Sequence, residues 1–569
     1  MESVRCEDSR EDVKSILPFL PLVLQSSSLS WSSPAAEALE TLSKGPEHSH
    51  VDSGVVMVVA LKDIRLSLSL FESIAPFAAE GYALFFDELL LQNDSDKWFK
   101  EILPFLARLL LQLPSLLEKH WQQADCYLNA NGCQIRTGLR LLEQQETGMV
   151  VLSQELIGAL LACSFFCLFG THKRASKQLP MINFDYLFAS LYERYSENQE
   201  SKVKCMVHYF ERICSHIPKG SVSFERKVLP LQCGSSAVSY PTADIWRKST
   251  VPLCHVEAHR CGFIEDHSRE SLKVDFANEY IGGGALKRGC VQEEILFMIY
   301  PELIVSMLFL PAMAENESIE MVGAERFSNY TGYASSFRFS GDNVDSMDFD
   351  FIGRRRTRFI AIDALCHPGK RQYRSQFILR ETNKAFCGFS NGSIHFKCEK
   401  LSKGDGCFGL PEDCSRGINS KPETHFLAPA AALDLEGEHK DKEVPDFEAA
   451  TNSPTLEQEE GVEIVTGNWG CGAFGGDPQL KAMIQWLAAS QALRSSMAYY
   501  TFGLEAVEDL EEVTKWILMH KWTVGDLWNM MEEYSSQRYR EETRLGFFTW
   551  LLPSGSNINA MTSQFMDDT

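Results

Sequence analysis

The sequence predicts an all-α region followed by an α/β (α+β) domain in which helices flank a sheet. Three observations lead to this prediction. Apolar residues recur at spacings of three and four over much of residues 34–214, Ser, Pro and Gly are frequent over 217–250, and short β-rich runs then alternate with helical runs. The length of 569 residues and the 44% of hydrophobic residues are typical of a globular protein with two or three domains.

Residues 1–220 are predicted to form the helical domain. The runs 98–121 and 184–213 have helical spacing, and no strand signal of comparable strength accompanies them. The most apolar stretch, 156–170 ("LIGALLACSFFCLFG"), is shorter than the roughly 20 residues that cross a bilayer, so we expect a buried core helix. The N-terminal residues are acidic where a secretory signal would be basic, so we expect neither export nor a membrane location.

Residues 221–545 are predicted to form the second domain. Strands are expected at 272–277, 318–324, 358–365, 461–467 and 497–503. Helices are expected at 291–309, 477–494 and 506–541, and a polar tail at 546–569. Residues from about 400 to 460 are predicted to be a flexible insertion, because many acids, Pro, Gly and Ser with few aromatic residues cannot bury enough surface to become ordered.

The charge and the cysteine pattern exclude several classes of function. A net charge of −23 argues against a protein that grips nucleic-acid backbones. The 17 cysteines form no CxxC pair, and "CHVEAHRC" (254–261) fits no standard zinc spacing, so we expect free thiols and no metal site. Eight basic residues lie between 354 and 380; they either compensate acidic neighbours or form an outer site for a polyanion.

Two glycine-rich loops each follow a predicted strand and open a predicted helix. The first is "GGGALKRGCVQEE" (282–294), and the second is "GNWGCGAFGGD" (467–477), where Asp477 is the expected N-cap and Pro478 the first helical residue. N–H groups at a helix start attract anions, and glycine lets a phosphate or ribose approach the backbone closely. Neither loop matches a dinucleotide or P-loop fingerprint. The pair predicts a ligand with a diphosphate; the alternative is two tight connections without a ligand.

Carboxylates accompany the first loop. Glu293 and Glu294 lie near the first helical turn, and Asp275 and Asn278 lie at the end of the preceding strand, where α/β sheets place ligand contacts. A carboxyl group beside a diphosphate is suited to protonating a leaving oxygen, and a carboxylate stabilises the oxocarbenium-like state of glycosidic cleavage. The alternative role of the glutamates is to complement the helix dipole, an effect of only about 0.3–1 kcal/mol.

Aromatic residues beside glycines suit stacking on an adenine or a ribose better than they suit a core. They are Tyr330, Tyr333, Phe474 and Phe502, although core packing is an equal alternative for Tyr330 and Phe502 taken singly. Cys290 and Cys471 also lie near the loops, but no histidine within either motif could act as a base for a thiol nucleophile.

Several segments resemble the poly(ADP-ribose) glycohydrolase family, in the order in which that family has them. They are "VDFAN", the three glycines followed after seven residues by "QEE", "PELIVSMLF", "YTGYA", "IAIDAL", "NKAFCGF" and "GNWGCGAFGGDPQLKA". The resemblance implies a macrodomain-like three-layer fold with a mixed sheet, preceded by an all-α accessory domain. The insertion at 400–460 has no counterpart that we can place in the core pattern of the family.

The resemblance also implies a function. Such an enzyme hydrolyses the ribose–ribose O-glycosidic bonds of poly(ADP-ribose) to release ADP-ribose, without a metal or a cofactor. Its partners would be poly(ADP-ribose) chains and poly(ADP-ribosyl)ated proteins, with no direct binding of nucleic acid. It would be a monomer in the nucleus or the cytoplasm, with a role in the DNA damage response; "RRRTR" (354–358) is a weak nuclear signal. The alternatives are a macrodomain reader that binds ADP-ribose without cleaving it, and a structural helical protein that carries a vestigial domain.

Residue roles follow from the same resemblance. Glu294 would be the catalytic acid/base, while Glu293, Asp275 and Asn278 would hold ribose hydroxyls. The other expected substrate contacts are Gly283, Gly284 and Gln292 in the first loop, Gly470, Gly472, Ala473, Phe474 and Gly475 around the diphosphate, and Tyr333, Phe474 and Phe502 around the adenosine.

Overall fold

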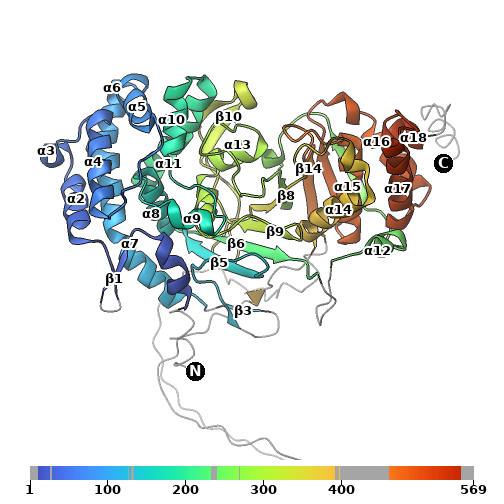
Figure 1. Cartoon of the computed structure of the whole chain (residues 1–569), viewed down its shortest axis with the longest axis horizontal. Coiled ribbons are helices and arrows are strands. Elements are labelled where there is room, and N and C mark those ends of the chain that lie inside the picture. Colours follow the sequence, from blue (N-terminus) through green and yellow to red (C-terminus); the bar gives the residue numbers. More distant parts are fainter. Residues whose placement is uncertain are drawn as a thin grey trace, which may run out of the picture.

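A computed structural model describes residues 11–552, apart from 26–27, 126, 130–133, 232–239, 268–269, 391–395 and 398–460. The predicted insertion at 400–460 and most of the predicted tail therefore lie outside the described residues. The molecule is elongated (Figure 1), with the helices of the first region at one end, a sheet in the middle and the C-terminal helices at the other end. The domain boundaries at 220 and 545 stay predictions.

An eight-stranded sheet occupies the middle of the molecule. Its order is β5 (Gly148–Ser153), β6 (Ser221–Val228), β9 (Glu317–Val322), β12 (Arg358–Ala361), β8 (Ser271–Asp275), β14 (Glu463–Gly467), β15 (Ser496–Tyr500) and β7 (His255–His259). The strands from β12 to β7 run parallel, whereas β5, β6 and β9 are joined by antiparallel pairings. The predicted mixed sheet is confirmed.

All five predicted strands are present, but three strands of this sheet were not predicted. β6 was not predicted because three consecutive residues, Glu225, Arg226 and Lys227, are charged and yet buried, so the strand lacks an apolar pattern. Arg226 pairs with Glu317 of the neighbouring strand, and the Lys227 ammonium donates to the carbonyl of Gly388 at 2.9 Å. β5 lies inside the region predicted to be helical, and β7, at the sheet edge, is rich in histidine.

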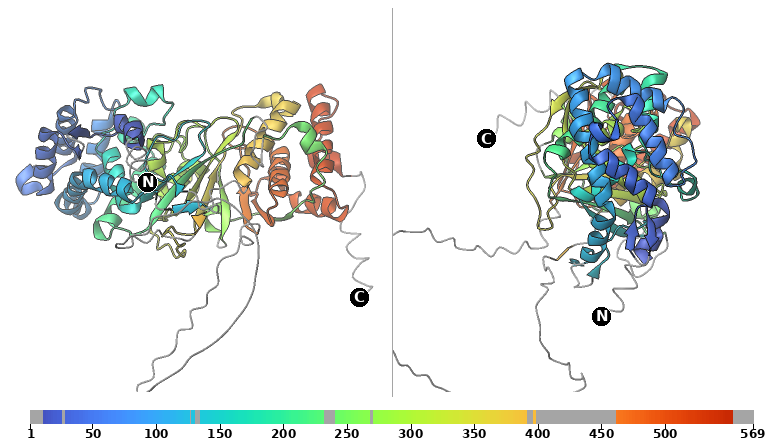
Figure 2. Two further views of the ribbon diagram at one scale, coloured as in Figure 1. Left: turned by 90° about the horizontal axis from the view of Figure 1, so that it is seen from below. Right: turned by 90° about the vertical axis from the view of Figure 1, so that its left-hand side faces the viewer.

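Helices cover both faces of the sheet, which makes the three layers that were expected (Figure 2). Side chains alternate along a strand, so Phe359 and Ala361 of β12 belong to one core while Ile360 and Ile362 belong to the other. The first core includes buried residues of α8, α11 and α13, and the second includes buried residues of α14, α15 and α17.

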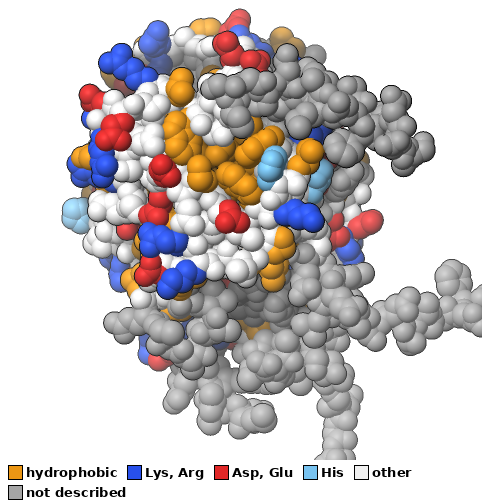
Figure 3. Space-filling view, turned by 90° about the vertical axis from the view of Figure 1, so that its right-hand side faces the viewer, with side chains coloured by type: hydrophobic (Ala, Val, Ile, Leu, Met, Phe, Trp, Pro, Cys, Tyr) orange, Lys and Arg blue, Asp and Glu red, His pale blue; other side chains and the backbone are white. Residues whose placement is uncertain are grey.

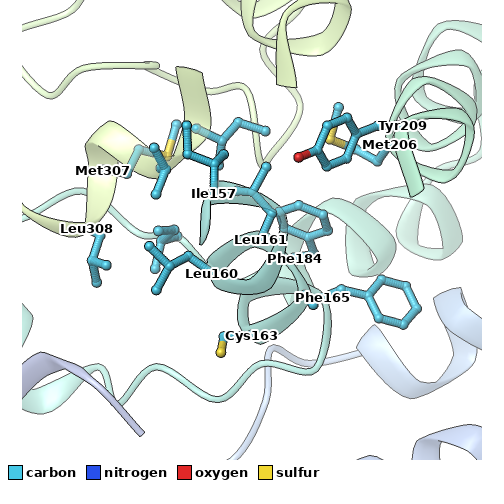
Figure 4. Close-up of a cluster of buried hydrophobic side chains, with 14 of the residues drawn as sticks. Ile157, Leu160, Leu161, Cys163, Phe165, Phe184, Met206, Tyr209, Met307 and Leu308 are labelled. Carbon is cyan, nitrogen blue, oxygen red and sulfur yellow. The ribbon is translucent and has the colours of Figure 1, made fainter. Parts of the chain in front are cut away.

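The first region is helical as predicted, with bounds α2 (Ser33–Ser43), α3 (Pro46–Ser49), α4 (Gly54–Ser67), α5 (Ala78–Ala83), α6 (Gln92–Lys97), α7 (Leu103–Gln123), α8 (Gln154–Phe165), α9 (His172–Ser176), α10 (Asp185–Glu193) and α11 (Glu197–Ser215). Two π-helical turns, Leu84–Leu89 and Trp98–Ile102, lie among them. The apolar stretch at 156–170 falls largely in α8, which is buried among side chains of α11 and of the segment after α13 (Figure 4). Within the described residues no helix is long and apolar enough to cross a membrane.

The helices of the second region are α12 (Ala243–Arg247), α13 (Gln292–Ile299), α14 (Ser375–Phe389), α15 (Pro478–Gln491), α16 (Leu510–Met519), α17 (Val524–Arg540) and α18 (Phe547–Leu551). The single helix expected at 291–309 is a partly wrong prediction. The α-helix ends at Ile299, and a 3₁₀-helix, η5 (Pro301–Leu308), continues it, because the residue before a proline disfavours the α conformation.

The end of the molecule formed by the C-terminal helices carries a group of hydrophobic side chains (Figure 3). Met519 at the end of α16 is 69% exposed, and Trp516 packs edge-on against Trp522, with 5.6 Å between ring centroids. A hairpin of β10 (Ser328–Thr331) and β11 (Arg338–Asp342) lies apart from the main sheet, and the remaining strands are β1 (Val23–Gln25), β2 (Ser28–Ser30), β3 (Tyr127–Asn129), β4 (Gln134–Ile135) and β13 (Phe396–Lys397).

Candidate active site

Both glycine-rich loops lie at the same edge of the sheet. β8 and β14 are parallel neighbours, and each leads into one of the loops at its carboxyl end. A cleft of about 440 Å³ lies beside them. Of the predicted site residues, the cleft is lined by Gln292, Tyr333, Gly470, Gly472, Ala473, Phe474 and Phe502. The remaining ones do not line it; they lie at the end of β8, in the two loops or in the first turn of α13, and they are Asp275, Asn278, Gly283, Gly284, Glu293, Glu294 and Gly475.

The two glutamates are each held by two backbone N–H groups. The Glu294 carboxylate accepts hydrogen bonds from the N–H of Gly284 and of Val291, both at 2.9 Å. The Glu293 carboxylate accepts from the N–H of Asn278 at 3.0 Å and of Gly282 at 2.7 Å. Both side chains are buried at the start of α13, and the loop therefore fixes both carboxylates.

The glycines of the first loop make room for these carboxylates. Gly283 has φ +48°, and a Cβ there would lie 2.4 Å from Oε2 of Glu293. A Cβ on Gly289 would lie 2.5 Å from Oε1 of Glu294. Such distances are too short for any side chain, so the bare backbone is required by the glutamates themselves as well as by any ligand.

Asp275 completes a cluster of three carboxyl groups. It is the last residue of β8, and its side chain lies on the opposite face of the strand from Leu272 and Val274. The side chain is fully buried. Within the described part of the chain, neither of its carboxylate oxygens has a hydrogen-bond partner. Burial raises the pKa of Asp275 well above its ordinary value of 3.8, and the charge of Glu294 adds to the rise. Burial, and then the charges of Asp275 and Glu294, likewise raise the pKa of Glu293.

Gln292 and Asn278 join the strand to the helix. The Gln292 side chain accepts from the N–H of Phe276 at 2.8 Å and donates to the carbonyl of Val274 at 3.2 Å, which ties the first turn of α13 to the end of β8. The Asn278 side chain accepts from the N–H of Tyr280 at 3.0 Å. The strand end and the helix start are therefore one rigid unit.

The second loop presents backbone N–H groups to the cleft. Gly470 needs its positive φ of 72°, and a Cβ there would lie 2.6 Å from that of Ala364. Within the described ranges, no residue accepts a hydrogen bond from the N–H of Gly472, Ala473 or Phe474. As predicted, Asp477 caps α15, since its side chain accepts from the N–H groups of the second and third helical residues. This loop is suited to an anion.

Aromatic rings wall one side of the cleft. The rings of Tyr333 and Phe502 lie 5.2 Å apart, and Phe263 bridges Phe502 at 5.9 Å and Tyr330 at 5.3 Å. Phe502 is half-exposed, and the Tyr330 hydroxyl donates to the buried carboxylate of Glu265. Burial raises the pKa of Glu265.

The lining residues that were not predicted include Phe263, Glu265 and Asn468. Phe263 follows Gly262, so the expectation that an aromatic residue beside a glycine stacks on a ligand, which pointed to Phe474, would also have pointed to Phe263. Glu265 lies in a short 3₁₀ turn with no motif to mark it. Asn468 donates to the carbonyl of Thr501 at 2.8 Å, a contact between two loops that periodicity does not show.

The basic residues between 354 and 380 are mostly ion-paired. The pairs are Arg354 with Asp350, Arg355 with Glu325, Arg356 with Glu270, Arg358 with Glu320, Lys370 with Glu541, and Arg380 with Asp363. Because these basic side chains already pair with acidic residues of the same chain, the structure favours the first alternative, in which they compensate acidic neighbours. It disfavours an outer site for a polyanion and an accessible nuclear signal.

Replacing Asp275 by Asn is expected to stabilise the protein at neutral and alkaline pH. The native state binds the Asp275 proton more tightly than the unfolded chain, so this group's contribution to stability is present below pH 3.8 and is lost as the pH rises toward the raised pKa. The unpaired carboxylate then destabilises the wild type by on the order of 1–3 kcal/mol. Thermal unfolding of both proteins from pH 5 to 8 should show a gap that widens with pH; a constant gap would contradict the assignment.

The fold and the site together define an α/β protein with a glycine-rich loop and a carboxyl cluster at one edge of a mixed sheet, an arrangement suited to acid–base chemistry on an anionic ligand. Comparison with known proteins gives the family. The family model for the poly(ADP-ribose) glycohydrolase macro domain fold matches residues 243–509, and the model for the helical domain of the same enzymes matches residues 90–226. The chain belongs to the poly(ADP-ribose) glycohydrolase family.

Curated relatives agree over almost the whole chain. Poly(ADP-ribose) glycohydrolase 1 of Arabidopsis thaliana is 54% identical over 559 residues, which cover 97% of this chain and 99% of the relative. Probable poly(ADP-ribose) glycohydrolase 2 of the same plant is 48% identical over 546 residues, covering 96% and 99%. Poly(ADP-ribose) glycohydrolase 1 of Caenorhabditis elegans is 30% identical over 345 residues, covering 58% of this chain and 35% of the relative.

Proposed function

We propose that this chain hydrolyses the ribose–ribose bonds of poly(ADP-ribose) and releases ADP-ribose, with Glu294 as the general acid and then as the general base for water. Membership of the family supports the reaction. The observation that supports the role of Glu294 is its carboxylate, held by two backbone N–H groups beside two further buried carboxyl groups. Burial raises the pKa of both neighbouring carboxyl groups, Asp275 and Glu293, so the site around Glu294 favours bound protons.

In the proposed reaction Glu294 first gives up a proton and later receives one from water. Glu294 donates the proton to the ribose oxygen that leaves as the glycosidic bond breaks, and positive charge develops on the other ribose as an oxocarbenium-like state. The negative charge of the cluster stabilises that state. A water molecule then attacks the same carbon and gives its proton to Glu294, which restores the starting form of the enzyme.

The remaining site residues would position the substrate. Asp275, Glu293 and Asn278 would hold ribose hydroxyls, and the free N–H groups of the second loop would hold the diphosphate. The adenosine would lie against Tyr333, Phe474 and Phe502 in the cleft, whose volume of about 440 Å³ is within the usual range for a small-molecule site.

Compartment and partners are proposed more broadly. The ten cysteines within the described residues are all free thiols, which suits the reducing nucleus or cytoplasm. The net charge of −23 disfavours direct binding to nucleic acid. Poly(ADP-ribosyl)ated proteins are the proposed partners because the family acts on poly(ADP-ribose). Action as a monomer in the DNA damage response rests on the resemblance alone.

The reaction is tested by incubating the wild-type protein with an auto-modified poly(ADP-ribose) polymerase. Free ADP-ribose should accumulate while the chains shorten, as followed by chromatography. Retention of intact chains by a protein that binds ADP-ribose would instead identify a non-catalytic reader.

A further inference from the structure

A buried lysine of the helical domain reaches the loop that holds Glu294. Lys202 lies in α11 and its side chain is fully buried. Its ammonium donates to the carbonyl of Lys287 at 2.7 Å and to that of Gly289 at 2.5 Å, and lies 3.5 Å from the carbonyl of Gly284. All three carbonyls belong to residues 284–289, which lead from the last of the three glycines toward the glutamates. One ammonium therefore holds this part of the loop together by hydrogen bonds.

The same loop sets the position of Glu294. The N–H of Gly284 donates to Glu294, and Gly289 packs so closely on its side chain that a Cβ would lie 2.6 Å from Cδ. A movement of either glycine therefore moves the carboxylate. Because Lys202 holds the carbonyls of both, its contacts are transmitted to the proposed proton donor.

Neighbouring residues of α11 reinforce this contact. The Gln199 side chain donates to the carbonyls of Leu187 at 3.0 Å and Lys287 at 3.2 Å. The Asn198 side chain donates at 3.1 Å to the carbonyl of Ala334, which follows the cleft residue Tyr333. One stretch of α11 thus holds two different walls of the site.

Packing alone does not explain a lysine at this position. Burial of an ammonium destabilises a fold by several kcal/mol unless hydrogen bonds and charge compensate, and an apolar side chain of similar size would avoid that penalty. Burial lowers the pKa of Lys202 to about 8. The ionisable groups that act on it include Cys290, Glu294, Cys205 and Arg288, and the negative charge of Glu294 favours the ammonium form of Lys202.

We propose that Lys202 is a positioning residue, through which the helical domain fixes the loop and the charge environment of Glu294. This inference rests on the proposed role of Glu294. It gives the helical domain a direct part in the reaction, beyond that of an accessory structure.

The test compares Lys202→Met with Lys204→Met, a control in which a half-buried lysine that pairs with Glu200 on the same helix is lost. Lys202→Met should lower kcat by about 10- to 100-fold, since small misplacements of a catalytic group have effects of this size. ADP-ribose affinity should fall less than kcat, by about threefold at most, because within the described residues no hydrogen bond joins Lys202 to the second loop, which is proposed to hold the diphosphate. Lys204→Met should leave kcat and affinity unchanged.

A double-mutant cycle separates positioning from a general loss of structure. If Lys202 acts through Glu294, Lys202→Met should lower kcat little further in a Glu294→Gln background. Losses that multiply, or a folded Lys202→Met protein with wild-type kcat, would overturn the inference. If Lys202→Met does not fold, Lys202→Gln, which keeps N–H donors without the charge, carries the same comparison. Full activity of Glu294→Gln alone would instead overturn the proposed function.

Discussion

Replacing Glu294 by Gln should lower kcat for release of ADP-ribose by about 10²–10⁴-fold, the usual contribution of a general acid–base group. A glutamine has the same size and its one oxygen can still accept from the N–H of Gly284, although its NH2 group cannot accept from Val291, so one of the two hydrogen bonds that hold the side chain is kept. It can neither give a proton to the leaving oxygen nor take one from water. ADP-ribose affinity should therefore stay close to that of the wild type.

Single-turnover release of ADP-ribose and calorimetric titration with ADP-ribose measure the two quantities in one preparation. Glu279→Gln is the matched control, because it removes the same charge from an exposed residue of the nearby loop. Near-normal turnover by Glu294→Gln would exclude this residue as the acid. Loss of binding together with turnover would show that the substitution disturbs the site as a whole.

Replacing Gly472 by Val should abolish tight binding of ADP-ribose. Gly472 lines the cleft, its φ is not in the left-handed region, and a Cβ there meets nothing within 4 Å. The protein should fold normally, and the new side chain should occupy the space proposed for the diphosphate. Loss of two charge-assisted hydrogen bonds, each about 1.5–3 kcal/mol, corresponds to an affinity at least about 100-fold lower.

Gly461→Val offers the control. Gly461 precedes the same strand, β14, at the end away from the loop, and a Cβ there also meets nothing within 4 Å. Calorimetry should find wild-type affinity for ADP-ribose in this variant and thermal unfolding should find both variants folded. Unchanged affinity in Gly472→Val would remove the diphosphate from the second loop.

The parts of the site that are local in sequence could be predicted from it. Each glycine loop follows its strand directly, and Asp477 and Pro478 mark the start of α15 within the same short stretch. The alternation of β-rich and helical runs likewise gave all five strands that were expected. Features formed by residues that are adjacent in the sequence, such as a glycine loop or a helix cap, can therefore be predicted from the sequence alone.

Contacts between distant segments could not be predicted in this way. Lys202 reads as an ordinary helical lysine, and only the fold brings it to the carbonyls of the first loop. β6 carries charged residues that look exposed until Glu317 pairs with Arg226 across the sheet. The glycines of the first loop suggested room for a ligand, whereas the atoms that a Cβ would meet at Gly283 are those of Glu293 and Glu294.

Dependence on the leaving group tests the role of Glu294 most directly. ADP-ribose joined through its distal ribose to 4-nitrophenol carries a leaving group that needs no proton, unlike the ribose hydroxyl of the polymer. In single turnover, Glu294→Gln should release nitrophenolate at a rate much closer to that of the wild type, with a deficit at least about tenfold smaller than its deficit on the polymer. An equal deficit on both substrates would contradict the account, because it would mean that Glu294 does not protonate the leaving oxygen.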